Sequence, residues 1–154
     1  MDVHDKATRS YNMSRIRSRD TKPEVRLRKL LWLCGHRGYR LQSKLPGKPD
    51  IVFARAKLAV FIDGCFWHGC PECGDGRAPS SNTTYWTAKR RMNRERDERR
   101  TRELEAMGWT VLRMWEHEVI KKAEECVVRI ERLLTRSSAS PSVRGTSRRR
   151  PTRR

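Results

Sequence analysis

Hydrophobic residues in the middle of the chain are grouped in short runs that predict strands. Residues 58–62 (LAVFI) form an apolar run that is long enough for a buried strand and too short for a helix. A second run at 50–54 can pair with it as a hairpin. If the loop spans 55–58, Asp50 lies opposite Asp63 on one face, with the two Cβ atoms about 5 Å apart. Two carboxylates that close need a cation or a shared proton, which favours Mg²⁺. Alternatively, Asp50 caps a turn and Asp63 ends a strand.

Helical periodicity begins upstream of this hairpin. Thr21 and Glu24, with proline between them, form a capping-box signature that predicts a helix start. The apolar positions that follow at helical spacing are Leu27, Leu30, Leu31 and Cys34, so we expect Cys34 in the core. Glu24 therefore has a structural role as the acid of the box, which weakens a catalytic one.

The second half of the chain alternates helix, strand and helix. A long basic helix is expected from Asn82 or Thr83 to Met107, then a strand at 109–115 and an amphipathic helix at 118–134. A strand–helix–strand crossover predicts that 109–115 runs parallel to 58–62. Gly38–Gln42 reads as a further short strand. These patterns predict an α/β (α+β) chain with a small mixed sheet flanked by helices, with Trp32, Trp109 and Trp115 in its core.

The net charge of the chain indicates the kind of molecule that it binds. The 154 residues carry 36 Lys and Arg against 18 Asp and Glu, a net charge of +18, which favours a nucleic acid. We expect a basic arm at 1–20, one domain at 21–135 and a disordered basic tail at 136–154. A membrane is not expected because no long apolar span is present. No signal peptide opens the chain, so a cytoplasmic location is expected, where clustered cysteines more often bind metal than form disulfides.

Three cysteines form a metal-ligand pattern in a loop at 65–73. Cys65, Cys70 and Cys73 offer three thiolates, and a structural zinc site needs a fourth ligand. His117 follows the strand expected beside 58–62, so it is the best-placed histidine. The alternative is unligated surface thiols, which are reactive when exposed.

These motifs resemble the very short patch repair endonucleases over about residues 2–134. The elements that carry the resemblance are Asp2–Ser10 (DVHDKATRS), Asp20-Thr21, Leu45–Asp50 (LPGKPD), Gly64–His68 (GCFWH), Tyr85-Trp86, Asn93–Asp97 (NRERD) and Gly108–Glu116 (GWTVLRMWE). The resemblance implies a three-layer, restriction-endonuclease-like fold with catalytic Mg²⁺ and structural Zn²⁺. It implies nicking of double-stranded DNA 5′ to the thymine of a T·G mismatch left by deamination of 5-methylcytosine. A nucleoid-associated monomer, with a mismatch-repair protein as a further partner, is expected on the same ground.

The resemblance also implies residue roles. Asp50 falls on the metal-binding aspartate, His68 on the catalytic histidine and Asp97 on the acid that pairs with it, and Glu24 matches an acid near the site. From the residues themselves, the same mechanism follows, because a positioned histidine can activate water beside a metal-bound phosphate. The residues expected to contact DNA are Phe66, Trp67 and Trp86, as wedging aromatics, together with Arg9, Arg15, Arg17 and Asn93.

The chain departs from the family pattern near its strand end. Asp63 stands where a second histidine is usual, so it is a candidate second ligand to Mg²⁺, but a proton donor to the leaving group is then missing. The spacing of Cys70 and Cys73 also differs from the commonest pattern, and His117 replaces a usual cysteine. Two alternatives therefore stay open: a non-catalytic zinc module that binds damaged DNA, or a nicking nuclease with another target.

Overall fold

Three strands form one mixed sheet in order β1-β2-β3 in the computed structural model of the chain. The structure describes Thr8, Tyr11 and residues 19–77, 79, 80 and 82–138. Its helices and strands are α2 (Lys22–Leu33), β1 (Ile51–Phe53), β2 (Leu58–Asp63), α3 (Cys65–His68), η1 (Gly74–Gly76), α4 (Thr83–Ala106), β3 (Thr110–Trp115), α5 (Glu116–Lys121) and α6 (Ala123–Ser138).

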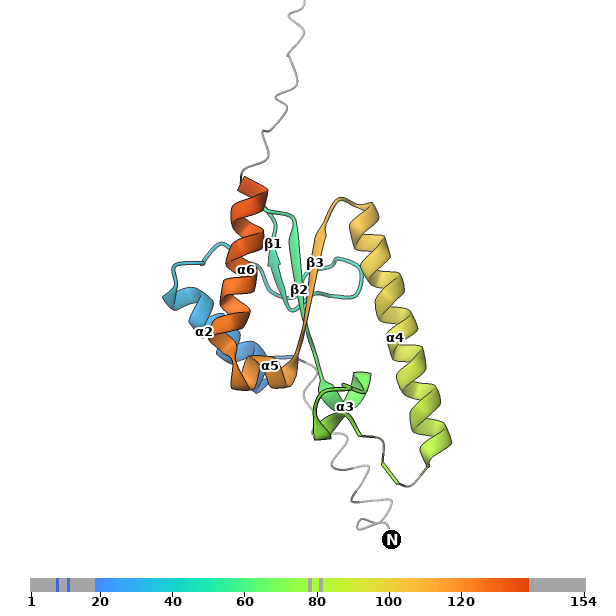
Figure 1. Cartoon of the computed structure of the whole chain (residues 1–154). Coiled ribbons are helices and arrows are strands. Elements are labelled where there is room, and N and C mark those ends of the chain that lie inside the picture. Colours follow the sequence, from blue (N-terminus) through green and yellow to red (C-terminus); the bar gives the residue numbers. More distant parts are fainter. Residues whose placement is uncertain (1–7, 9–10, 12–18, 78, 81, 139–154) are drawn as a thin grey trace, which may run out of the picture.

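The crossover through α4 returns the chain parallel to β2, as predicted. Leu58 pairs with Thr110 at one end and Asp63 with Trp115 at the other. Both strands therefore end at the same edge of the sheet, and the segments that follow them start side by side. This edge lies near α3 and the first half of α4 in Figure 1.

The hairpin register differs from the predicted one by two residues. Phe53 pairs with Leu58 and Ile51 with Val60, so the same register places Asp50 level with Phe61 rather than Asp63. The turn has the expected four residues but lies one residue earlier, at 54–57, where the Lys57 amide donates to the Ala54 carbonyl at 3.2 Å and Lys57 has a φ of 48°. The cross-strand pair of Asp50 and Asp63 is therefore wrong.

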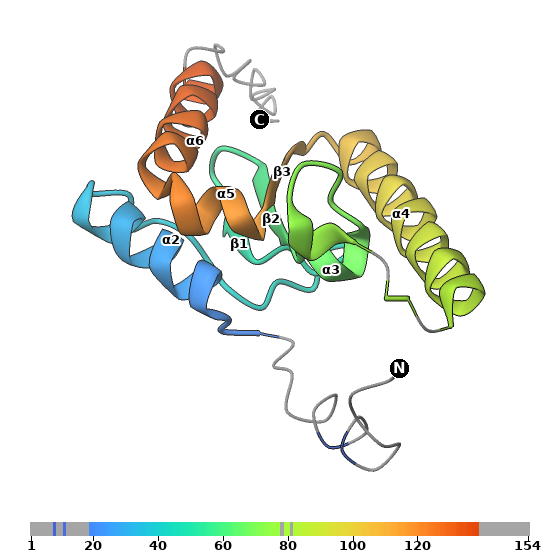
Figure 2. The same ribbon diagram turned by 60° about the horizontal axis from the view of Figure 1, so that its bottom comes forward.

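Helices cover both faces of the sheet, which gives three layers (Figures 1 and 2). Leu58 and Val60 point into the core under α2, α5 and α6, which also holds Leu27 and Ile130. The alternate positions of β2 face α4, where Leu104 is fully buried against Ala59 and Phe61. This arrangement confirms the small mixed sheet flanked by helices, consistent with the restriction-endonuclease-like α/β fold.

Several expectations at the margins of the core are wrong. Cys34 is exposed, because α2 ends at Leu33, before this last periodic position. Trp32 lies within α2 but is 51% exposed, since Leu27 and Leu31 form the buried face of the helix. The strand expected at 38–42 is reduced to a single bridge between Arg40 and Val52. The last helix is divided at Lys122 into α5 and α6. Among the described helices, none is both long and apolar enough to cross a membrane.

Candidate active site and metal loop

A histidine–aspartate pair lies beside the end of β2. Nδ1 of His68, in α3, is 2.7 Å from Oδ2 of Asp97, in the middle of α4, and both side chains are less than one-fifth exposed. Burial would raise the pKa of Asp97, but the hydrogen bond and charge of His68, with the charge of Arg113, lower it overall. Because Nδ1 is occupied by the carboxylate, Nε2 is the nitrogen left to accept a proton. Sequence reasoning had placed these two residues together, and the structure brings them into contact.

Asp63 is held by an arginine rather than by Asp50. Its two carboxylate oxygens accept from Nε and Nη2 of Arg113, in β3, at 2.8 and 2.6 Å. The same Nη2 is 3.7 Å from Oδ2 of Asp97. A bidentate arginine pair satisfies the carboxylate without a metal, so the geometry from which we expected Asp63 to bind Mg²⁺ is not present.

These side chains line a cavity of about 460 Å³ between the strand ends and α4. Arginines and acids occur there in equal number, so the wall carries charge of both signs. Its lining residues are Asp63, His68, Arg94, Asp97, Glu98, Thr101, Arg102, Arg113, Met114 and Trp115.

Asp50 precedes β1 as a partly buried carboxylate in an acidic environment. Its Oδ2 accepts from the Ile62 amide at 2.7 Å. Burial raises the pKa of Asp50 to about 6, the hydrogen bond from Ile62 opposes this, and the charges of Glu24 and Asp63 add to it. A carboxylate whose pKa is raised by burial, with nearby acids adding to it, is stabilised in its ionised form by an added cation.

Glu24 is buried and its oxygens are engaged at the start of α2. Oε2 accepts from the Asp20 amide at 2.8 Å and Oε1 from the Thr21 hydroxyl at 2.7 Å. The predicted capping box is therefore not formed, because Thr21 makes no side-chain cap and Glu24 accepts from the Asp20 amide instead of the Thr21 amide. Glu24 still holds the segment that enters α2. Its charge nevertheless reaches Asp50, as the pKa of that group shows.

The four residues predicted to hold a metal lie together. The Sγ atoms of Cys65, Cys70 and Cys73 and a ring nitrogen of His117 are all within 4.8 Å of one another. Nδ1 of His117 is 3.2 Å from Sγ of Cys65 and 3.7 Å from Sγ of Cys70. Burial raises the pKa of the Cys65 thiol to about 12, and a bound cation would oppose this by favouring the thiolate. The cluster can hold a metal ion.

Two further residues fix the loop that carries these ligands. Oε2 of Glu116, the first residue of α5, accepts from the Cys65 amide at 3.1 Å, so α5 and α3 are joined beside the cluster. Gly76 packs so closely that a Cβ on it would lie 1.9 Å from the Cys70 carbonyl oxygen. The loop is therefore packed against its own ligand segment, with no space for a side chain at this position.

Arg90 is a structural residue that sequence reasoning missed. It is 7% exposed, and its Nη1 and Nη2 donate to the carbonyls of Gly76 and Arg77 at 2.7 and 2.9 Å. Its guanidinium carbon also lies 4.9 Å from the centroid of the Phe66 ring. Arg90 therefore joins α4 to residues 76–77, the segment that directly follows the last cysteine ligand and that we include in the metal loop. It is one of many basic residues in α4, so nothing in the sequence distinguishes it.

The aromatic residues expected to contact DNA form one cluster. Phe66 lies 5.2 Å from Trp67 and 5.0 Å from Trp86 between ring centroids, with edge-to-face geometry. Tyr85, which is 60% exposed, extends the cluster from Trp86. Phe66, Trp67 and Trp86 are half-buried against one another, so the cluster presents apolar edges at the surface without isolated exposed rings.

The remaining residues expected to contact DNA are placed differently. Asn93 is buried, and its Nδ2 donates to the Trp67 carbonyl at 2.9 Å, so it positions the aromatic segment instead of facing solvent. Arg9, Arg15 and Arg17 lie outside the described residues.

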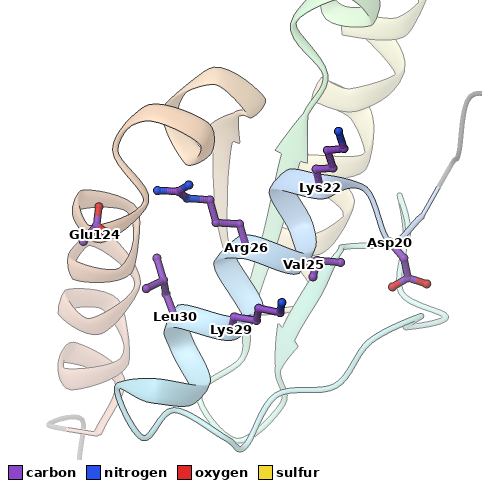
Figure 3. A pocket seen from close by; sticks show the side chains of 7 residues that line it. All are labelled: Asp20, Lys22, Val25, Arg26, Lys29, Leu30 and Glu124. Atoms are coloured by element: carbon purple, nitrogen blue, oxygen red, sulfur yellow. The ribbon is translucent and has the colours of Figure 1, made fainter.

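A larger hollow, of about 640 Å³, lies along α2 (Figure 3). Arg26 and Leu30 point from α2 towards the side of α6 that carries Glu124, and Lys22 and Lys29 add positive charge. It contains none of the predicted site residues. We therefore do not assign the active site to this hollow, although it is larger than the cavity lined by His68 and Asp97.

Comparison with known proteins agrees with this chemistry. A family model described as DNA mismatch endonuclease Vsr matches residues 1–73. The Type II nicking enzyme V.NaeI of Lentzea aerocolonigenes is 48% identical over 127 residues, which are 79% of this chain and 75% of that protein. The Type II nicking enzyme V.NmeAIP of Neisseria meningitidis serogroup A is 43% identical over 133 residues, 86% and 94% of the two chains. DNA mismatch endonuclease Vsr of Escherichia coli K12 is 45% identical over 116 residues, 75% and 73%.

Proposed function

Because the chain belongs to the family of DNA mismatch endonuclease Vsr, we propose that it nicks one strand of a duplex 5′ to the thymine of a T·G mismatch. The chain is a DNA endonuclease, a hydrolase whose partner is DNA. Deamination of 5-methylcytosine opposite guanine produces such a mismatch, and nicking beside the thymine would allow its removal.

The observation that carries this proposal is the contact between His68 and Asp97 in the cavity at the strand ends. Hydrolysis forms a bond from water oxygen to phosphorus and breaks the bond from phosphorus to the 3′ oxygen. Nε2 of His68 takes the proton of the attacking water, and Asp97 stabilises the imidazolium and holds the ring. The departing 3′ oxygen takes a proton from solvent, which leaves a 3′ hydroxyl and a 5′ phosphate.

Asp50 is the residue that would hold Mg²⁺. Its Oδ2 accepts from Ile62, and no group in the described part of the chain bonds to its Oδ1, which suits an oxygen-seeking cation. When bound, the ion would neutralise phosphate charge and lower the pKa of a bound water. We do not assign Asp63 as a second ligand, because Arg113 occupies both of its oxygens.

Cys65, Cys70, Cys73 and His117 would hold Zn²⁺ in a structural site. Tetrahedral Zn²⁺ with the usual bond lengths separates a sulfur from a nitrogen ligand by about 3.5 Å. Nδ1 of His117 lies 3.2 Å from the sulfur of Cys65 and 3.7 Å from that of Cys70, so the donor set and the spacing both suit zinc. The ion would join the segment after β2 to the segment after β3, and thereby support α3.

Mismatch preference would come from the aromatic cluster of Phe66, Trp67 and Trp86. Partly buried rings that meet at one surface can enter a base step that a mismatch has weakened. Sequence-independent affinity would come from the excess of positive charge, including Lys22, Arg26 and Lys29 on α2.

A nicking assay tests the proposal. Duplexes that carry one T·G, T·A or C·G pair in the same surroundings are labelled on each strand and incubated with Mg²⁺. The thymine strand of the T·G duplex should be cut 5′ to the thymine, and His68→Ala and Asp50→Asn should abolish cutting. His36→Ala is a matched control, because His36 pairs with Glu131 at 2.8 Å and does not line the site cavity. Equal cutting of T·G and T·A duplexes would overturn the proposal.

A second candidate function is nicking at another target, which the names of two relatives favour. A pool of duplexes with all eight single-base mismatches and matched controls separates the two. Selective cutting of a different pair, or of a matched sequence, would favour this second candidate.

A further inference from the structure

We propose that Arg113 binds the phosphate that is cut, and that Asp63 acts by positioning Arg113. The inference rests on the proposed function, because it assigns a phosphate-binding group to the same site. It gives Asp63 a role that replaces the one expected for it as a metal ligand.

Three contacts hold the guanidinium of Arg113 in one orientation. Asp63 accepts from Nε and Nη2 in a bidentate pair at 2.8 and 2.6 Å. The guanidinium carbon lies 4.5 Å from the centroid of the Phe61 ring, which is buried in the sheet. A planar cation fixed on one edge and one face has lost its rotational freedom before any substrate arrives.

The remaining donors of Arg113 are available to a ligand. No residue in the described ranges accepts from its Nη1, and its side chain is 25% exposed in the cavity that His68 also lines. Nη2 is 3.7 Å from Asp97, the partner of His68, so the guanidinium and the imidazole share one wall. A group that reaches His68 Nε2 for proton removal is therefore close to the free donors of Arg113.

The chemistry of these donors selects a phosphate oxygen. A guanidinium fork matches the spacing of two oxygens on a phosphate, and it remains charged at any working pH. It cannot donate a proton to the departing 3′ oxygen, so its contribution is to the negative charge on the non-bridging oxygens in the transition state. Arg94 and Arg102 also line the cavity, but they are exposed on α4 and no carboxylate fixes them among the described residues.

Paired substitutions test the roles of the two residues. Arg113→Met should lower kcat on the nicked duplex about a hundredfold, as for removal of one transition-state donor. Asp63→Asn should lower kcat by a smaller factor, and the double variant should be no slower than Arg113→Met alone, because Asp63 acts through Arg113. Arg113→Lys should recover part of the loss. The Mg²⁺ concentration for half-maximal rate should be unchanged in all of them.

The control is an ion pair outside the cavity. Arg100 and Glu103 in α4 are 2.7 Å apart, and Arg100→Met removes the same charge without touching the site. Its kcat should stay within about twofold of wild type, as expected for a surface pair. Circular dichroism and metal content of each variant show whether it is folded.

Replacing one non-bridging oxygen of the phosphate that is cut by sulfur shows whether Arg113 or the metal ion contacts that oxygen. One of the two phosphorothioate isomers should slow the wild type, and Mn²⁺, which accepts sulfur better than Mg²⁺ does, should not restore the rate. In Arg113→Met this isomer should cause no additional loss. Restoration by Mn²⁺, or a raised Mg²⁺ requirement in Asp63→Asn, would overturn the inference and place the metal at this oxygen.

The two proposals fail separately. A wild type that cuts a duplex without a T·G pair overturns the proposed function, and the variants are then measured on that duplex. A wild type that cuts T·G duplexes, with Arg113→Met equally active, overturns only the inference. A wild type that cuts no duplex overturns both.

Discussion

Replacing Arg90 by methionine should loosen the metal loop and destabilise the protein. Methionine keeps much of the apolar stem but removes two charged hydrogen bonds to the Gly76 and Arg77 carbonyls and the stacking on Phe66. Each such bond contributes about 1.5–3 kcal/mol, and the cation–π interaction about 1 kcal/mol. Relief of the cost of burying the charge offsets part of this, so we expect a net loss of about 3 kcal/mol.

The loss can be measured by urea and thermal denaturation of the metal-loaded protein. For a chain of this size about 3 kcal/mol corresponds to a fall in Tm of roughly 6–12 °C. Arg90→Lys should give an intermediate fall, because one ammonium cannot replace a guanidinium that spans two carbonyls. Release of metal to a colorimetric chelator should also be faster in Arg90→Met, since the restrained carbonyls belong to the loop.

The neighbouring Arg91 provides the control. Its side chain is 71% exposed and pairs with Glu95 at 3.6 Å on the solvent face of α4. Arg91→Met removes the same charge from the same helix and should cost about 0.5 kcal/mol or less. If the two substitutions lower the free energy of unfolding equally, the loss comes from removing a positive charge from α4. That result would refute the argument from buried hydrogen bonds.

Three further predictions concern the loop and the aromatic cluster. Removing the metal with a chelator should lower Tm as well as activity, and Cys70→Ser with Cys73→Ser should reduce the bound zinc, measured by elemental analysis, from one ion per chain to none. Gly76→Ala should strongly destabilise the loop, whereas Gly74→Ala, where a Cβ meets nothing within 4 Å, should melt like wild type. Phe66→Ala with Trp67→Ala should shrink the ratio of T·G to T·A binding. Deletion of 139–154, which leaves α6 whole, should instead weaken binding of both duplexes alike. The salt slope of log K should then fall by about 0.9 for each phosphate that the deleted segment had neutralised.

The sequence was sufficient to predict most of the layers. α4 and β3 lie within a residue or two of their predicted ranges, because Asn82 and Gly108 delimit a long helix and the next run is strongly apolar. The hairpin register could not be obtained in this way. A shift of two residues keeps every side chain on the same face, so the hydrophobic pattern is the same in both registers. The observed register is accompanied by a turn at 54–57 in which Lys57 has a positive φ, and the hydrophobic pattern does not indicate this conformation.

The site was predictable where strand ends determine it. Cys65 and His117 were expected together because parallel strands end at one edge, and they lie in contact. Arg113 was not expected, because it occurs within an apolar strand and its partner Asp63 comes from another strand. Periodicity indicates which face a residue occupies, but it does not indicate which charged side chains on neighbouring strands pair.

The shortness of α3 has a consequence for inactivation. It is a single turn of four residues, and such a helix is not stable alone. Glu116 and the cysteine cluster hold its first residue, and His68 is its last. When metal is scarce, this turn should open while the sheet remains intact. Amide hydrogen exchange at Phe66, Trp67 and His68 should then accelerate well below the melting temperature, and over that range the protein would be folded but unable to cut DNA.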